Sequence, residues 1–465
     1  GIAAVTLLAL PALAASSLGN SKVVAGNGET LPAYVVAQAA IDPQVGTLVL
    51  TPQPDGGLGA VLVRGTGMTL EGTSTFVTTG AGFAPQEQIL ANTVSNLASV
   101  SGNLRGVVRV TGNFTSQSPL HPAAKALLTE AFSQGWADPI KIGDSSARTA
   151  ILRNEAIESL ANNLSVSPNE IEVIGEPRLG QHLAISGLLD PQTQLFHSAI
   201  DRKSVFAVSN THQANGGKSQ VLPVDAIGNI LVSQRSTGPS VLALQGVNIE
   251  TGITQEVDRV ISELDPTYIA LDYSAAPNLK FPSRWDSAIL DATTWQGPAG
   301  IGILLIRNST KWKNPLPNLG LRRTPESSSL PLLLASAVAL DAWLNDQKNE
   351  SKRLLQLNLR LRSELAVAIP DISFAGTIDN CQSQLLGMSI PGCVGEDLVR
   401  QLNELGFVLD SGSACTAEQM QPSHVFAALK INDAGNLRIT LHHGVTEEEI
   451  TDLINAITLV VQRSR

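Results

Sequence analysis

The sequence "VLALQGVNIETGITQEVDRVISELDPTYIALDYS", residues 241–274, contains the pattern that decides the fold. It begins and ends with short apolar runs, 241–247 and 268–274, each of which stops at small or polar residues. Apolar runs of this length are typical of short strands that are buried on both faces of a parallel sheet. We therefore expect two strands in this stretch.

Helices and short apolar strands alternate on both sides of this stretch, from about residue 106 onward. Such alternation predicts an α/β fold built on a large, mostly parallel sheet that helices cover. The other expected elements are strands at 170–175, 204–209 and 300–306, and helices at 121–135 and 147–164.

A long helical pattern at 330–369 divides this part of the chain. It is a natural spine between two lobes. We expect a large lobe at about 120–325 and a smaller C-terminal α/β lobe at about 326–465.

The N-terminal part has a different composition. Residues 1–18 carry no charge, and three interpretations stay open: a signal peptide without its basic start, part of a membrane helix, or a helix of the mature chain. Localisation stays open: residues 1–18 would anchor the chain at a membrane, whereas the resemblance given below for residues 106–465 implies the cytoplasm. For residues 19–105 we expect a small α/β accessory segment. Its expected helices are at 31–41 and 85–100, and its expected strands are at 46–52 and 59–65.

Composition excludes several classes of protein. Of the 465 residues, 43% are apolar and 15% are charged, which is typical of a globular chain with a large core. The net charge is −10 with no long basic cluster, so nucleic acid is not an expected partner. Cys381, Cys393 and Cys415 form no CxxC pair, and His442 and His443 would point to opposite faces of a strand. We expect no metal site.

Several motifs occur together in one order between residues 106 and 465. They are "HPAAKALLTEAF" (121–132), "VLPVDAIGNI" (221–230), "ETGITQEV" (250–257), "PGCVGEDLVRQLNELGF" (391–407), "SGSACTA" (411–417), "PSHVFAALK" (422–430) and "TEEEITDLINAI" (446–457). In order and spacing this part of the chain resembles class V aminotransferase-fold proteins, and specifically the cysteine desulfurases.

Residues 31–70 carry a second resemblance. The sequence "LPAYVVAQAAIDPQVGTLVLTPQPDGGLGAVLVRGTGMTL" is similar to the extracytoplasmic C-terminal tail of some actinobacterial family-2 glycosyltransferases. This resemblance covers about residues 1–105. It implies a membrane-proximal accessory segment and no sugar-transfer activity.

The desulfurase resemblance implies a pyridoxal 5'-phosphate enzyme of fold type I, usually a homodimer with active sites at the subunit interface. It implies L-cysteine as substrate, or a persulfide donor or acceptor protein as partner. Cys415 takes the position of the loop cysteine that attacks the substrate sulfur and becomes a persulfide. Arg438 takes the position that binds the substrate carboxylate, and Asn248 is a retained substrate-binding residue.

The cofactor site departs from the family pattern. "DATTWQGPAG" (291–300) places Thr294 where the family has the lysine that forms a Schiff base, and Asp291 where a serine binds the phosphate. Threonine cannot form an imine, and an aspartate repels a phosphate. Arg178 stands at the threonine of the phosphate cup, and Arg202 stands at the histidine that stacks on the ring.

Asp272 is kept at the end of an expected buried strand, where the family has the aspartate that pairs with the pyridine nitrogen. A second interpretation of Asp272 is structural, with a neighbouring amide or arginine as its partner.

We therefore predict a degenerate cysteine desulfurase homologue with impaired cofactor binding and a retained loop cysteine for persulfide handling. Two alternatives are an active desulfurase, in which another lysine or a partner supplies the amine, and a decayed fusion or non-catalytic scaffold.

Overall fold

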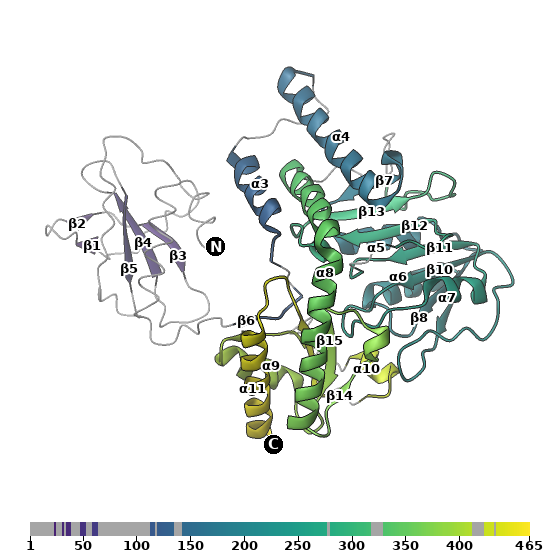
Figure 1. Ribbon diagram of the computed structural model, residues 1–465. Coiled ribbons are helices and arrows are strands. Elements are labelled where there is room, and N and C mark those ends of the chain that lie inside the picture. The colour runs from purple at the N-terminus through teal and green to yellow at the C-terminus, as the bar shows by residue number, and fades with distance from the viewer. Residues whose placement is uncertain are drawn as a thin grey trace. The chain divides into compact units, whose positions relative to one another are not determined.

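The computed structural model describes residues 112–116, 119–133, 142–276, 280–317, 329–411, 423–431 and 434–465, and the backbone of five short strands before residue 64. The chain divides into two compact units, residues 1–109 and 110–465 (Figure 1). Each unit is described by itself.

The first unit contains antiparallel strands. They are β1 (Val23–Val24), β2 (Thr30–Leu31), β3 (Tyr34–Gln38), β4 (Thr47–Pro52) and β5 (Leu58–Val63), paired as β1–β2 and β3–β4–β5. The strands expected at 46–52 and 59–65 are confirmed as β4 and β5. The helix expected at 31–41 is wrong, because residues 34–38 form β3, in which Tyr34 and Val35 pair with β4 and aromatic and β-branched residues favour a strand. Residues 1–18 and 85–100 lie outside the described residues.

A seven-stranded sheet forms the base of the second unit. Its strands are β7 (Ile171–Ile174), β8 (Gln194–Ser198), β9 (Lys218–Leu222), β10 (Ser240–Gln245), β11 (Tyr268–Asp272), β12 (Ser287–Asp291) and β13 (Gly302–Ile306). Their order is β7-β13-β12-β11-β10-β8-β9, and only β13 runs antiparallel to its neighbours. The prediction of a large, mostly parallel sheet is confirmed.

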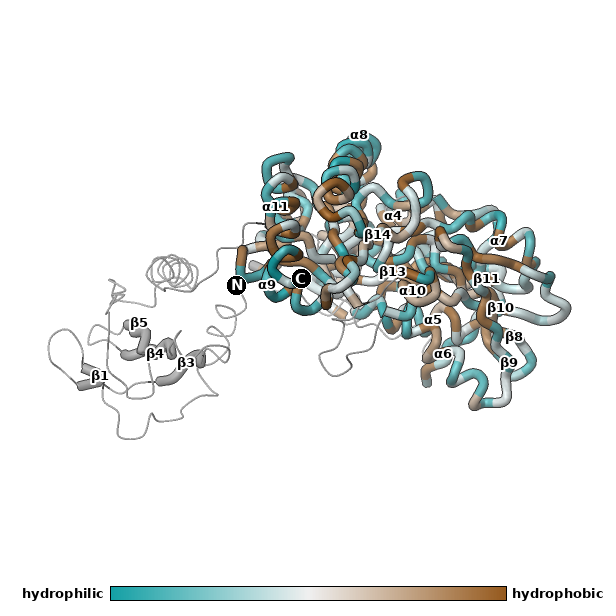
Figure 2. Tube along the Cα trace, turned by 90° about the horizontal axis from the view of Figure 1, so that it is seen from below, coloured by the Kyte–Doolittle hydropathy of each residue, from teal (hydrophilic) through white to brown (hydrophobic). Residues whose placement is uncertain are grey.

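Helices cover both faces of this sheet. On β10, Leu242 and Leu244 belong to a core shared with α3 (Pro122–Ser133), α4 (Asp144–Leu164) and α7 (Val257–Leu264). Val241 and Ala243 pack instead with α5 (Pro177–Ser186) and α6 (Lys203–Ala214). Because successive side chains of a strand alternate between faces, a strand buried on both faces must be apolar throughout. Figure 2 shows this apolar character at β10 and β11.

One helix joins the two lobes. Helix α8 (Leu330–Ala368) is unbroken over 39 residues and runs from the large sheet to the C-terminal lobe (Figure 1). Its first half places Leu333 and Leu340 in the core of the large lobe, and its second half places Leu354 and Leu361 in the core of the small lobe. The expected spine at 330–369 is therefore present.

The small lobe is an antiparallel sheet with helices against it. The sheet contains β14 (Ser373–Phe374), β15 (Leu385–Ser389) and β17 (Asn436–Thr440), and the helices are α9 (Gly395–Glu404), α10 (His424–Ala428) and α11 (Glu447–Ser464). A short parallel pair, β6 (Gly112–Asn113) with β16 (Phe407–Val408), ties the start of the second unit to this lobe. Three 3-10 turns complete the elements, η1 (Pro168–Glu170), η2 (Ala292–Trp295) and η3 (Ile378–Asn380).

The strand expected at 204–209 is wrong, because these residues lie in helix α6. Its buried residues Val205, Val208 and His212 recur at intervals of three and four residues, which is the spacing of one helix face. A short apolar run is compatible with either element, and here the helical face packs against the sheet.

In the parts of the chain that the structure describes, no helix combines the length and the apolar composition that a membrane crossing requires.

Two leucines of α8 provide a test of the spine. Leu361 is fully buried and Leu359 is 38% exposed. We expect Leu361→Ala to lower the free energy of unfolding by about 2–5 kcal/mol, because it leaves a cavity in the small-lobe core. Leu359→Ala should lower it by no more than about 0.5 kcal/mol. Urea unfolding followed by circular dichroism measures both values, and equal losses would contradict this packing.

Candidate functional site

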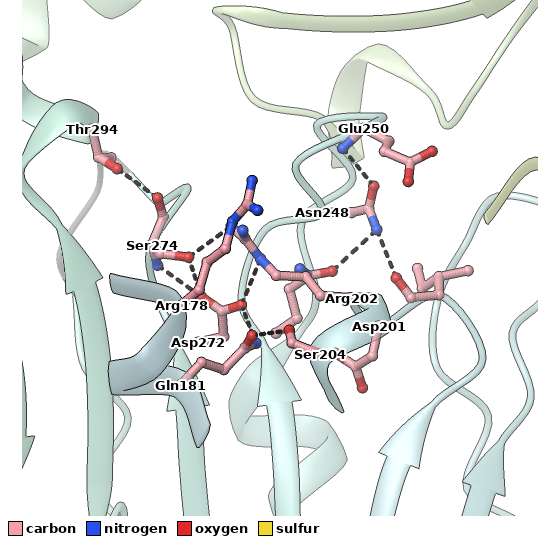
Figure 3. A network of polar contacts seen from close by, with 12 residues as sticks. Arg178, Gln181, Asp201, Arg202, Ser204, Asn248, Glu250, Asp272, Ser274 and Thr294 are labelled. Atoms are coloured by element: carbon pink, nitrogen blue, oxygen red, sulfur yellow. Dashed lines mark hydrogen bonds and ion pairs between the residues drawn. The ribbon is translucent and has the colours of Figure 1, made fainter. Parts of the chain in front are cut away.

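Three of the predicted site residues, Arg202, Asp272 and Thr294, lie at the carboxyl edge of the large sheet. Asp272 is the last residue of β11, and it pairs in register with Gln245, the last residue of β10. Arg202 follows β8, and Thr294 follows β12. Parallel strands that end at one edge bring the loops after them together, which is why residues far apart in sequence share this region. Figure 3 shows the side chains of Arg202, Asp272 and Thr294.

The carboxylate of Asp272 is buried and fully occupied by partners from the chain itself. Its Oδ2 atom accepts a hydrogen bond from Gln181 Nε2 at 2.8 Å and lies 3.0 Å from Arg202 Nε in an ion pair. Its Oδ1 atom accepts from the Ser274 backbone N–H at 2.9 Å and from the Ser274 hydroxyl. An amide, a guanidinium and a serine therefore satisfy a carboxylate that is only 5% exposed.

The partners of Asp272 also bind one another. Arg202 Nη2 donates to Ser274 Oγ at 2.7 Å, and the Ser204 hydroxyl donates to Gln181 Oε1. We call Gln181, Arg202, Ser204, Asp272 and Ser274 the Asp272 network (Figure 3). Because each member restrains the next, the network holds the Arg202 guanidinium against the carboxylate.

Thr294, at the expected lysine position, has a structural partner. Its hydroxyl donates to the backbone carbonyl of Ser274 at 2.7 Å. Asp291 caps the short turn η2 by accepting from Thr293 N at 3.0 Å and from Thr293 Oγ1 at 2.7 Å. Burial raises the pKa of the Asp291 carboxyl above its ordinary value, although these hydrogen bonds oppose the rise. This turn presents a carboxyl and hydroxyls and no amine.

The first turn of α5 lies at the expected phosphate cup. Glu176 is the N-cap residue of α5, and its Oε1 atom accepts from Arg178 N at 3.0 Å. Pro177 contributes no N–H group. The chain's own carboxylate thus takes the position in which an anion would meet the amides of a helix N-terminus. The Arg178 side chain is exposed, and the structure gives its guanidinium no ion pair among the described residues.

Asn248 holds the turn after β10. Its Nδ2 atom donates to Ile200 O at 2.8 Å and to Gln245 Oε1 at 3.1 Å. Its Oδ1 atom accepts from the backbone N–H groups of Glu250 and Thr251, both at 3.0 Å. All these bonds are within the chain, so Asn248 shapes the loop that approaches the small lobe.

Arg438, on β17 of the small lobe, is paired with an aspartate. Its Nη2 atom lies 2.6 Å from Asp410 Oδ2, and its Nη1 atom donates to Ile249 O at 3.3 Å. Nη2 also reaches Ser116 Oγ at 3.4 Å. The guanidinium is 9% exposed, and Asp410 is 25% exposed. Arg438, which was expected to bind a substrate carboxylate, therefore already contacts the carboxylate of Asp410.

Cys415 lies outside the described residues. Cys393 is buried, and Cys381 is half-buried, where burial raises the pKa of its thiol. His442 donates from Nε2 to Thr115 O at 2.7 Å, whereas His443 lies 3.5 Å from Glu350. Within the described ranges, no three His, Cys, Asp or Glu side chains gather as ligands for a metal ion.

Sequence comparison on motifs had not identified four groups of this site: Glu176, Gln181, Ser274 and Asp410. Glu176 and Gln181 lie within three residues of Arg178, which stands at the expected phosphate cup, and Asp410 directly precedes the motif of residues 411–417. Their positions were thus visible in the sequence, but their partners come from distant segments.

A family model described as "Aminotransferase class-V" matches residues 179–453. The chain belongs to this family. Two relatives of this class-V chain are a cysteine desulfurase of Azotobacter chroococcum, 22% identical over 72% of this chain and 88% of the relative, and an IscS-like cysteine desulfurase of Mycobacterium tuberculosis, 24% identical over 75% and 95%. The predicted resemblance to cysteine desulfurases is confirmed.

Solved structures agree on the fold. A NifS-like protein superposes with a TM-score of 0.68 at 18% identity and covers 76% of this chain and 99% of its own. The apo cysteine desulfurase of Thermococcus onnurineus superposes with a TM-score of 0.64 at 16% identity, over 76% and 94%. The class-V chain therefore has the fold of pyridoxal phosphate enzymes of fold type I.

A buried acid next to the Asp272 network makes stability depend on pH. Burial raises the pKa of Asp201 to about 8, and the nearby Asp272 charge adds to the rise, while a hydrogen bond from Ser198 N and the Arg202 charge oppose it. The folded chain thus holds a proton on Asp201 that the unfolded chain releases above about pH 4. The stability that Asp201 provides is complete below that pH and is lost as pH rises to about 8.

We expect Asp201→Asn to raise the melting temperature relative to the unsubstituted chain more at about pH 8 than at about pH 5, because asparagine stays neutral. Asp379→Asn, at an exposed position, is the control and should show no such difference. Scanning calorimetry at the two pH values measures it. If the change in melting temperature caused by Asp201→Asn is the same at both pH values, burial does not raise the pKa of Asp201 in the folded chain.

Proposed function

We propose that this chain is a cysteine desulfurase-like member of the class V family that does not use pyridoxal phosphate and handles sulfur through Cys415. The observation that carries the proposal is the pairing of Asp272 with Arg202, at 3.0 Å. The Arg202 guanidinium lies beside Asp272, where the protonated ring nitrogen of pyridoxal phosphate would have to bind.

The residues of the site do not fit the cofactor. Imine formation requires an amine, and position 294 supplies a hydroxyl that already donates to Ser274 O. A phosphate group requires hydrogen-bond donors and positive charge. Here the carboxylate of Glu176 caps α5 and the carboxyl of Asp291 caps η2, so acceptors stand where donors would be needed. We therefore assign no step of the reaction to the cofactor.

Electrostatics strengthens this argument. Glu176 and Asp291 are close enough for Glu176 to raise the pKa of Asp291, so the two carboxyls already repel each other. A phosphate dianion between them would meet like charges in a partly buried region, where Coulomb energies exceed those in water. Two arginines offer compensating positive charge: Arg178 on an exposed side chain, and Arg202, which lowers the pKa of Asp291 but is already paired with Asp272.

Cys415 supports a role that needs no electron sink. As a thiolate it attacks the outer sulfur of a donor persulfide, R–S–SH. The donor's S–S bond breaks, a new S–S bond forms on Cys415, and the donor leaves as a thiolate. This exchange involves no net oxidation or reduction of the sulfur atoms, so it requires no redox or electron-withdrawing cofactor. Partner identity and a homodimer remain proposals that rest on the family resemblance.

Cofactor binding is the first test. Purified chain titrated with pyridoxal phosphate should develop no imine absorbance, and borohydride treatment followed by peptide mapping should recover no single modified lysine. Thr294→Lys should not restore the band, because Arg202, Glu176 and Asp291 keep their places. An active cysteine desulfurase is the positive control. Near-stoichiometric trapping of the cofactor on one lysine of the unsubstituted chain would overturn the proposal.

Sulfur handling is the second test. We expect no sulfide release from L-cysteine in the presence of pyridoxal phosphate and a reductant. We expect one added sulfur on Cys415, seen by mass spectrometry, after incubation with an active cysteine desulfurase that carries a persulfide on its own loop cysteine. Cys415→Ala should abolish this addition, and Cys381→Ser should keep it, because the Cys381 thiol is packed against Gly376. Sulfide release that depends on Cys415 would instead favour an active desulfurase.

A further inference from the structure

The Asp410–Arg438 pair is built differently from an ordinary surface ion pair. Asp410 Oδ2 lies 2.6 Å from Arg438 Nη2 and also accepts from Ser116 N at 2.7 Å. The backbones of the two residues are joined as well, since Arg438 N donates to Asp410 O at 2.8 Å. The carboxylate is therefore held in one place by both its side chain and its backbone.

The two terminal nitrogens of the Arg438 guanidinium are already engaged by acceptors of the chain. Its Nη1 atom is directed to Ile249 O, and its Nε atom is buried and has no hydrogen-bond partner among the described residues. Nη2 carries the one charged contact, and Asp410 makes it. The other acid on the facing turn, Glu250, is bound by the Ser423 hydroxyl at 2.6 Å. No second carboxylate of the described chain contacts Arg438.

We propose that Asp410 is a specificity-determining residue. Its carboxylate forms an intramolecular ion pair with Arg438 and thereby prevents small carboxylate ligands from binding to this arginine. A free amino acid that approaches Arg438 would have to displace a tethered, doubly held carboxylate and would bring a like charge beside it. An intramolecular group at this distance has a large effective concentration over any free ligand.

One consequence rests on the proposed function. If Cys415 receives sulfur, its donor is selected for lacking a carboxylate at the Arg438 position, which disfavours free cysteine and favours a persulfide carried on a protein. The blocking role of Asp410 does not depend on this, and its test involves neither the cofactor nor Cys415.

The test is rescue by a free carboxylate. Asp410→Ala leaves Arg438 buried without its partner, which should lower the melting temperature. Sodium acetate should then raise the melting temperature of this variant by about 1–3 °C more than sodium chloride of equal ionic strength does, because acetate binds the folded state at Arg438. Acetamide, which has the same shape without the charge, should have no effect. The unsubstituted chain should respond equally to acetate and chloride.

Two further variants sharpen the result. Asp397→Ala breaks an exposed pair with Arg400 of the same 2.6 Å length, and it should show no acetate effect. Asp410→Ala combined with Arg438→Gln should lose the effect. If Asp410→Ala does not fold, Asp410→Ser provides the smaller change for the same titration. An equal acetate response with and without Asp410, or one that survives the loss of Arg438, would overturn the proposal.

Discussion

The carboxylate of Asp272, buried at the end of β11, sets the central constraint on this molecule. A charge removed from water must be paired and hydrogen-bonded, or the fold loses stability. Here Arg202 provides the cation, while Gln181 and Ser274 provide the remaining donors. All of these partners belong to the chain itself.

The same principle recurs at two other points. Glu176 provides the anion for the first turn of α5, and Asp410 provides the anion for Arg438. In each case a charged or polar group at a position predicted to bind a ligand is paired with a side chain of the same chain. Intramolecular partners of this kind keep these buried charged groups paired within the folded chain.

Much of this architecture could be predicted from the sequence, for physical reasons. Residues 241–244 and 268–271 are apolar because both faces of β10 and β11 are covered. The long helix at 330–369 carries apolar residues into two cores. The run at 204–209 misled because a short apolar segment fits a helix face as well as a strand. Motif order placed Asp272, Arg202 and Thr294 at one site. The partners of these residues, Gln181 and Ser274 among them, depend on side-chain geometry that no spacing reveals.

The most direct measurement is a crystal structure of the chain grown with excess pyridoxal phosphate. We expect Arg202 Nε to stay at its present distance of 3.0 Å from Asp272 Oδ2, with no pyridine ring between Arg202 and the sheet edge. Electron density for a pyridine ring whose nitrogen contacts Asp272, with Arg202 turned away, would contradict it.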